Sequence, residues 1–217
     1  MFLRASSSIT LLLLIVFACS SVRADTWALP RERKFYSSDK KYCLEVIPKK
    51  LESQLAYFED KSEGRKDPGA VKGLKGNRAR AIFYELESDG YSKKFEFPLV
   101  NEVSPVEALV SLDGKYVVTF DNWHHVGYGD DVVVIYRSDG TLVKKFALED
   151  LLTKADIRKV SHTASSRWWG LDHYIDDNKG ILYLRVGSKE DFHDLGIELA
   201  TGRPLETKRD LFQQNEF

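Results

Sequence analysis

Residues Ala108 to Asp150 decide the fold, and they read ALVSLDGKYVVTFDNWHHVGYGDDVVVIYRSDGTLVKKFALED. Two runs of β-branched and aromatic residues, Tyr116 to Phe120 and Val132 to Tyr136, have the length and composition of β-strands. Ser111 to Lys115 and Ser138 to Gly140 are turn sequences whose glycines tolerate a positive φ. The stretch therefore predicts four β-strands joined by tight turns.

Weaker copies of this pattern precede and follow it. Each copy reads as strand, acidic turn, strand, loop, strand, glycine turn and strand. The acidic turn and the glycine turn lie 26 residues apart in the second unit (Asp113 and Asp139), 25 apart in the third and 50 apart in the first. We expect one all-β domain of three repeated antiparallel four-stranded sheets, formed by residues of about 27–100, 101–150 and 165–207.

Three segments depart from the strand pattern. The excess length of the first unit falls in residues 61–80, which contain four glycines, one proline and seven basic residues and predict a solvated loop, with a basic docking patch as the alternative. Residues 49–60 fit either a helix or a strand, and we favour a strand. Residues 148–160 carry apolar side chains at helical spacing, with Thr153 and Asp156 as a cap, and predict a short helical segment between the second and third units.

The first 24 residues have the features of a signal peptide. Met1 to Arg4 is positively charged, and Ile9 to Cys19 is an apolar run of 11 residues, whereas a bilayer-spanning helix needs about 20. Val22-Arg23-Ala24 provides small residues for cleavage before Asp25. We expect a secreted or periplasmic protein without a transmembrane segment. The alternative is an outer-membrane lipoprotein, because the residues before Cys19 resemble a bacterial lipobox.

The composition limits the classes of partner. The chain has 32 basic and 33 acidic residues, and this near-neutral balance argues against nucleic acid as the main partner. After cleavage at Ala24, Cys43 is the remaining cysteine, so no internal disulfide is expected. Cys43 alternates with apolar residues and has no base beside it in the sequence, so a buried structural role is favoured over a nucleophilic one.

The segments Ser111 to Val118 and Val132 to Val143 resemble the blade repeats of bacterial β-propellers, most of all the YVTN and TolB-like kinds. Such a repeat carries an SPDGK turn, a strand, a V-x-V-I-D run and a T-G turn. Leu112 stands in place of the proline, and the third unit keeps only Asp177 to Gly180. Together, DNWHHVGYGDDVVVIY and SSRWWG also resemble an uncharacterised family of secreted bacterial proteins, and this second resemblance implies no activity.

The propeller resemblance leaves the arrangement of the three units open. Closed propellers generally have four or more blades. Three units therefore imply a partial or open β-propeller, a compact stack of sheets, or closure by a second copy of the chain in a homo-oligomer.

The loop from Asp121 to Asp131 is the first candidate site, because aromatic, imidazole and carboxylate groups rarely gather in a plain connector. Its candidate ligand-binding residues are Asn122, Trp123, His124, His125, Tyr128 and Asp130. Neighbouring histidines on an extended chain point to opposite faces, so a shared metal ion is not expected. One histidine could still bind a metal with Asp121, Asp130 or His162, and the alternative is that both histidines stabilise turns.

Arg167, Trp168 and Trp169 form the second candidate. On a strand, one tryptophan would enter the core and the other could stack on a sugar or anchor a protein, and packing of both in the core is an equal alternative. Ser165, Ser166, His162 and Asp172 invite comparison with a serine hydrolase, but the chain has no G-x-S-x-G elbow.

The sequence thus predicts an exported binding or interaction module that presents these loops to a protein or glycan. No catalytic residue, metal ligand or cofactor is assigned. The alternative function is metal-assisted hydrolysis by His124 or His125 with nearby carboxylates.

Overall fold

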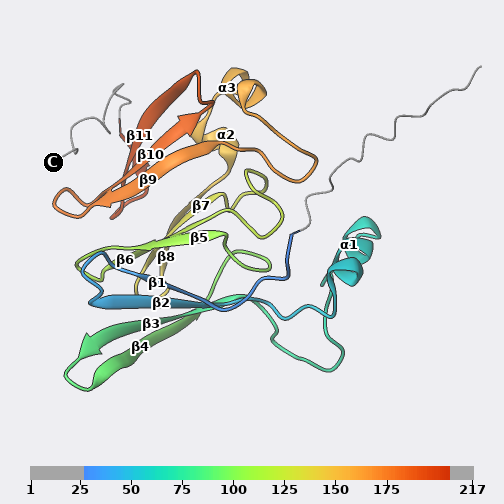
Figure 1. The fold of residues 1–217 in the computed structure, drawn as a ribbon, viewed down its shortest axis with the longest axis horizontal. Helices are drawn as coiled ribbons and strands as arrows, with labels where there is room; N and C mark the ends of the chain where they lie inside the picture. Colours follow the sequence, from blue (N-terminus) through green and yellow to red (C-terminus); the bar gives the residue numbers. More distant parts are fainter. Residues whose placement is uncertain (1–26, 206–217) are drawn as a thin grey trace, which may run out of the picture.

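Three four-stranded antiparallel sheets make up most of the computed structural model, which describes residues 27–205 (Figure 1). The first sheet contains β1 (Arg33–Tyr36), β2 (Tyr42–Ile47), β3 (Arg80–Glu87) and β4 (Gly90–Pro98). The second contains β5 (Glu107–Val110), β6 (Tyr116–Phe120), β7 (Val133–Arg137) and β8 (Leu142–Phe146). The third contains β9 (Gly170–Asp176), β10 (Ile181–Gly187), β11 (Phe192–Glu198) and β12 (Arg203–Pro204). In each sheet the strands follow one another in chain order, which confirms the three predicted units.

The helices are short. Helix α1 (Gln54–Ser62) replaces the strand predicted within residues 49–60, so that prediction is wrong. The Ser53 side chain caps this helix by accepting a hydrogen bond from the Ala56 N–H at 3.0 Å, and the Tyr57 side chain is buried beneath it. The helical segment between the second and third units is confirmed and consists of α2 (Leu148–Leu151) and α3 (Lys154–Lys159), the latter capped by Thr153.

The acidic turns of the first two sheets repeat the same hydrogen bonds. In the second sheet the Ser111 hydroxyl donates to the Asp113 carboxylate at 2.7 Å, and that carboxylate accepts from the Lys115 N–H at 3.0 Å. In the first sheet Ser37 and Asp39 make the equivalent pair of contacts. The repeated sequence S-x-D therefore specifies a repeated local structure.

The second sheet is buried on both faces. Alternate side chains of β6 and β7 point to opposite sides: Val117, Val134 and Tyr136 pack against the first sheet, and Val118, Val133 and Ile135 pack against the third. All residues from Val132 to Tyr136 are at most 1% exposed. This double burial explains why β7 is a continuous apolar run without the alternation of a half-exposed strand.

The two end sheets carry ion pairs on their outer faces. On the first sheet Arg80 pairs with Glu96 at 3.0 Å. On the third, Arg185 pairs with Asp194 at 2.9 Å, and Asp194 is fully buried. The two end sheets therefore carry charged residues on the faces that point away from the second sheet, one pair exposed and the other largely buried.

None of the helices in residues 27–205 has the length and apolar composition needed to cross a bilayer. The predicted signal peptide, its cleavage site and Cys19 lie outside the described residues. Cys43 is buried in β2, and burial raises the pKa of its thiol.

The glycine turns let neighbouring sheets approach closely. Gly140, between β7 and β8, has φ +89°, and a Cβ added there would lie 2.3 Å from Cβ of Phe97 in the first sheet. Gly202 is placed in the same way against Lys144 of the second sheet. Gly90 holds the equivalent turn in the first sheet, where φ is +118° and no atom lies within 4 Å of an added Cβ.

Replacement of Gly140 by alanine should therefore destabilise the protein more than replacement of Gly90. Both variants place a side chain at positive φ, but only Gly140→Ala also forces Phe97 out of its position, which adds about 1–3 kcal/mol. Urea unfolding followed by tryptophan fluorescence measures the difference. Equal loss of stability in the two variants would contradict this account of how the sheets pack.

Candidate functional site

The loop between β6 and β7 is a compact turn and not an extended segment. Asp121 and His124 have φ of 55° and 56°, and the Asn122 side-chain carbonyl accepts hydrogen bonds from the N–H groups of Val103 and Ser104. The rings of His124 and His125 are stacked, with centroids 5.3 Å apart and planes at 15°. The prediction that the histidines point to opposite faces is wrong, because the left-handed conformation of His124 turns the two rings to the same side.

Trp123 and His124 belong to an aromatic cluster beneath α1. Trp123 is 4% and His124 7% exposed. Both rings contact Tyr57 and Phe58 of the helix, at centroid distances of 4.6–6.2 Å. The Trp123 indole N–H also donates to the Ala28 carbonyl at 2.8 Å. These two side chains hold α1 and the N-terminal segment on the second sheet.

The histidines of this loop are partly or fully withdrawn from water. Burial and the neighbouring His125 lower the pKa of His124 to about 4, and burial also lowers the pKa of His125. Neither ring nitrogen of His124 has a hydrogen-bond partner within the described part of the chain. In residues 27–205 no group of three His, Cys, Asp or Glu side chains is placed to bind a metal ion.

The other candidate residues are divided between core and surface. Trp169 is 4% exposed, whereas Trp168 is 51% exposed. The Arg167 guanidinium lies over the Tyr128 ring, 4.2 Å from its centroid. Asp130 pairs with Lys145 on the surface. The predicted aromatic and cationic groups that solvent can reach are thus His125, Tyr128, Arg167 and Trp168.

Asp121 connects the two candidate segments. Its Oδ1 accepts hydrogen bonds from the Gly127 N–H at 2.6 Å and from the Trp169 indole N–H at 3.0 Å. The indole N–H also lies 3.2 Å from Oδ2. Burial raises the pKa of Asp121 to about 7, although both hydrogen bonds favour the charged form. A carboxyl group whose pKa is raised toward neutrality can both donate and accept a proton.

Asp121 opens into a cavity of about 180 Å³ between the second and third sheets. Glu107 of β5 and His173 of β9 line the same cavity, with His173 Nε2 3.4 Å from Glu107 Oε1. The imidazole stacks on the Phe120 ring at a centroid distance of 4.1 Å, which restricts its rotation. The exposed Trp168 also borders the cavity. An imidazole, its half-exposed carboxylate partner and a buried carboxyl group of raised pKa therefore line one small pocket.

The sequence analysis did not identify Glu107 and His173 as site residues. Glu107 lies in the second repeat and His173 in the third, so they are close only because the two sheets stack on each other. A signal was present in β9, where His173 occupies a position facing the apolar second sheet, two residues before Ile175. A polar residue at an inward position of a strand is a reason to look for a site.

Comparison with known proteins gives similarity of fold only. No family model and no curated protein sequence matches the chain. One similar solved structure is a periplasmic gluconolactonase of Pseudomonas aeruginosa, with 14% identity, a TM-score of 0.38, and 75% of this chain aligned to 38% of that one. Another is a protein of Bacteroides fragilis described as a 6-phosphogluconolactonase, with 15% identity, a TM-score of 0.38, and 82% of this chain aligned to 37% of that one. The chain spans less than two fifths of the length of either protein.

The prediction of a non-catalytic binding module is corrected. It depended on loops presenting Trp123, Tyr128 and either Trp168 or Trp169. Trp123 is a core residue, Tyr128 is half-buried, and Trp168 is the exposed member of the pair. The two similar structures bear the names of lactonases.

The buried carboxyl group should make stability depend on pH in a defined direction. The pKa of Asp121 is raised from 3.8 to about 7, so its contribution to stability is fully present below pH 3.8 and is lost as the pH rises through about 7. We expect the unfolding free energy of the wild type, relative to Asp121→Asn, to fall between pH 4 and 8, by up to about 4 kcal/mol.

Asp139→Asn is the matched control for this measurement. The Thr141 N–H lowers the pKa of Asp139, so that carboxylate stabilises the fold above pH 3.8, and its contribution is lost only as the pH falls. Urea titrations of the three proteins at several pH values distinguish the two directions. A wild-type advantage over Asp121→Asn that rises with pH contradicts the assignment.

The two neighbouring tryptophans should respond differently to truncation. Trp169→Ala removes a buried ring and the hydrogen bond to Asp121, and large-to-small changes of this kind cost about 3–5 kcal/mol. Trp168→Ala removes a half-exposed ring, so the fold should lose less than about 1 kcal/mol. Thermal and urea unfolding of both variants measure the contrast, and similar losses would show that Trp168 is also structural.

Proposed function

We propose that this protein is a hydrolase that cleaves a small ester or lactone by general acid–base catalysis in the cavity between the second and third sheets. The observation that carries the proposal is that His173, Glu107 and Asp121 line one cavity. The proposal rests on this geometry and not on the similarity to the lactonases.

His173 is assigned as the general base. Glu107 Oε1 lies 3.4 Å from Nε2 of the imidazole, and a carboxylate at that position favours the tautomer that carries its proton on Nε2. Nδ1 is then free to accept a proton from a water molecule. The resulting hydroxide attacks the substrate carbonyl, while Glu107 stabilises the imidazolium ion that forms.

Asp121 is assigned as the general acid. Its Oδ1 accepts the two stronger hydrogen bonds, from Gly127 and Trp169, so Oδ2 is the oxygen that carries the proton. With a pKa raised to about 7 by burial, a large fraction of the carboxyl groups is protonated at neutral pH. When the tetrahedral intermediate breaks down, this proton passes to the departing alkoxide oxygen.

Removal of either partner should slow hydrolysis. His173→Gln and Asp121→Asn should each lower kcat/KM by about 100-fold or more, and Glu107→Gln should lower it less, because that residue acts through His173. The assay uses p-nitrophenyl acetate, δ-valerolactone and glucono-δ-lactone with purified protein lacking residues 1–24. The loss in Asp121→Asn is expected on the two lactones, because p-nitrophenolate departs without a proton. The wild-type rate should also decline above pH 7, as Asp121 loses its proton.

His162→Gln is the matched control, since that imidazole lies outside the cavity and contacts the Val160 carbonyl. It should leave the rate unchanged. Circular dichroism and urea unfolding check that each variant is folded. Absence of wild-type activity on all three substrates, or equal activity in His162→Gln and His173→Gln, rejects the proposal.

We further infer that residues 25–217 form a single exported domain whose repeats are related to YVTN and TolB-like blades. The charged start, the short apolar run and Val22-Arg23-Ala24 support export, and the S-x-D-G turn of the second unit supports the relationship.

Export predicts a defined N-terminus for the mature protein. Intact-mass spectrometry of protein recovered from the periplasm or medium of a bacterial host should show Asp25 as the first residue. A lipidated Cys19 would instead establish the lipoprotein alternative, and retention of Met1 would reject both forms of processing.

A further inference from the structure

A second, larger cavity lies apart from the candidate active site. Its volume is about 770 Å³. Three segments form its walls: residues 29–32 before β1, residues 47–51 between β2 and α1, and residues 74–80 before β3. The last of these belongs to the basic loop that the sequence singled out.

The cavity walls carry an excess of positive charge. Arg31, Lys50, Lys75 and Arg80 line it together with a single unpaired carboxylate, Glu32. Arg80 pairs with Glu96 at 3.0 Å, and Glu96 also pairs with Lys93. The side chains of Arg31, Lys50 and Lys75 form no ion pair with any residue in 27–205. Three unpaired cations against the one carboxylate of Glu32 leave the hollow with a net positive charge, and the resulting potential attracts anions.

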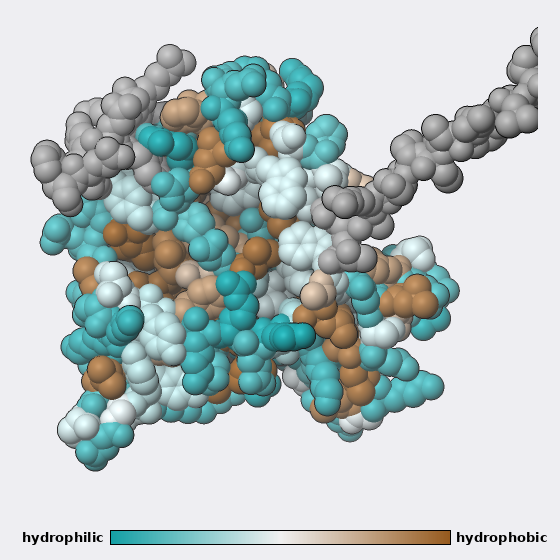
Figure 2. Space-filling model, in the orientation of Figure 1, coloured by the Kyte–Doolittle hydropathy of each residue, from teal (hydrophilic) through white to brown (hydrophobic). Residues whose placement is uncertain are grey.

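The same cavity contains exposed apolar side chains. Leu29 and Leu74 are 46% and 47% exposed, and Pro30 and Pro48 extend this apolar surface. Figure 2 shows hydrophobic surface beside hydrophilic surface over the connection between α1 and β3. An inorganic anion would leave these leucines in water, whereas an organic anion would cover them.

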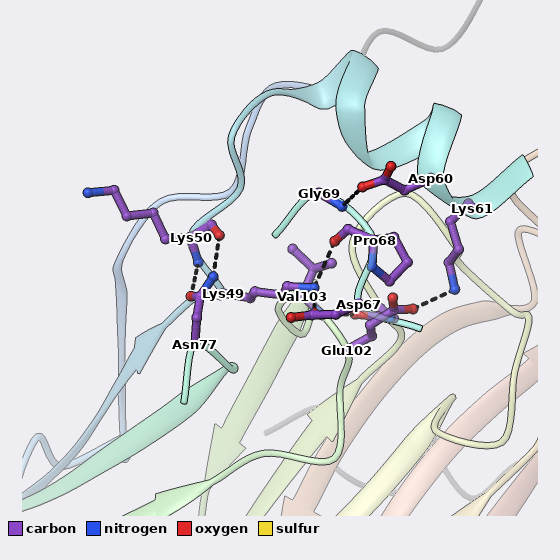
Figure 3. A network of polar contacts seen from close by, with 11 residues as sticks. Lys49, Lys50, Asp60, Lys61, Asp67, Pro68, Gly69, Asn77, Glu102 and Val103 are labelled. Carbon is purple, nitrogen blue, oxygen red and sulfur yellow. Dashed lines mark hydrogen bonds and ion pairs between the residues drawn. The ribbon is translucent and has the colours of Figure 1, made fainter. Parts of the chain in front are cut away.

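The wall that carries Lys50 is fixed in place before any ligand binds (Figure 3). The Asn77 side chain accepts a hydrogen bond from the Lys50 N–H at 2.8 Å and donates one to the Lys50 carbonyl at 2.6 Å. This pair of bonds joins the β2–α1 connection to the basic loop. A preorganised wall reduces the entropy lost on binding.

Lys49 and Lys50 have different surroundings. The Lys49 ammonium is buried and donates to Asp67 at 2.5 Å and to the Pro68 carbonyl at 2.8 Å, so it fastens the basic loop to the first sheet. Figure 3 shows the Lys50 side chain extending away from this network. The buried lysine is therefore used for folding, and the exposed one remains available for a ligand.

We propose that this cavity binds a small organic anion with an apolar body, such as an alkyl or aryl carboxylate, sulfate or phosphate. The anionic group contacts Lys50 and Lys75, with Arg31 nearby, and the apolar body covers Leu29 and Leu74. This binding site is separate from the cavity of His173 and does not depend on the proposed hydrolysis.

The test uses 8-anilinonaphthalene-1-sulfonate, an aryl sulfonate whose fluorescence rises on binding, titrated into folded protein at 0.15 M salt. The double variant Lys50→Gln/Lys75→Gln should raise its Kd about tenfold, since two charge-assisted contacts are lost. Leu74→Ser should also weaken binding, because it removes apolar contact area. Sodium decanoate should compete with the probe, and sodium sulfate at the same ionic strength should not.

Lys66→Gln/Lys154→Gln is the matched control, because it removes two exposed lysines that do not line the cavity. It should leave the Kd unchanged, and urea unfolding should show that both double variants are folded. Equal weakening in the two double variants would mean that only net charge matters, which overturns the proposal. Competition by inorganic sulfate, or undiminished binding to both the lysine and the leucine variants, overturns it as well.

Discussion

The hydrogen bonds of one buried carboxyl group, that of Asp121, join the second sheet, its long loop and the segment before the third sheet. Asp121 joins the end of β6 to Gly127 in the following loop and to Trp169 in the segment before β9. It thereby connects the second sheet to the third, and it fixes the loop whose next residues anchor α1. The cost is a carboxyl group out of water, which appears as a pKa raised to about 7. The same arrangement that joins the sheets also produces a group with useful proton chemistry.

Much of the fold could be predicted from the sequence, because the information is local. The alternation of strand and turn residues and the S-x-D turns act within a few residues of one another, so the three sheets were recognisable. Helix α1 was not, since residues 49–60 fit two patterns and burial of Tyr57 against Trp123 decided between them. Tertiary contacts overrule a weak local preference in such cases.

The candidate site was less accessible to sequence reasoning. Trp123 and His124 attracted attention as unusual residues in a loop, but their aromatic rings serve the packing of α1 and the N-terminal segment. Glu107 and His173 are ordinary residues of two strands that lie 66 positions apart. Only the stacking of one sheet on the next brings them together, and no pattern within a single repeat records that contact.

The close contacts at the glycine turns all run from one sheet to the sheet that precedes it in the chain. Gly140 in the second sheet makes room for Phe97 of the first, and Gly202 in the third makes room for Lys144 of the second, whereas Gly90 in the first sheet faces open space. The second and third sheets thus each carry a glycine turn that allows close packing against the preceding sheet. During synthesis from the N-terminus, a sheet that has formed needs no change in its own turns before the next sheet packs against it. Assembly can therefore proceed one repeat at a time as the chain emerges.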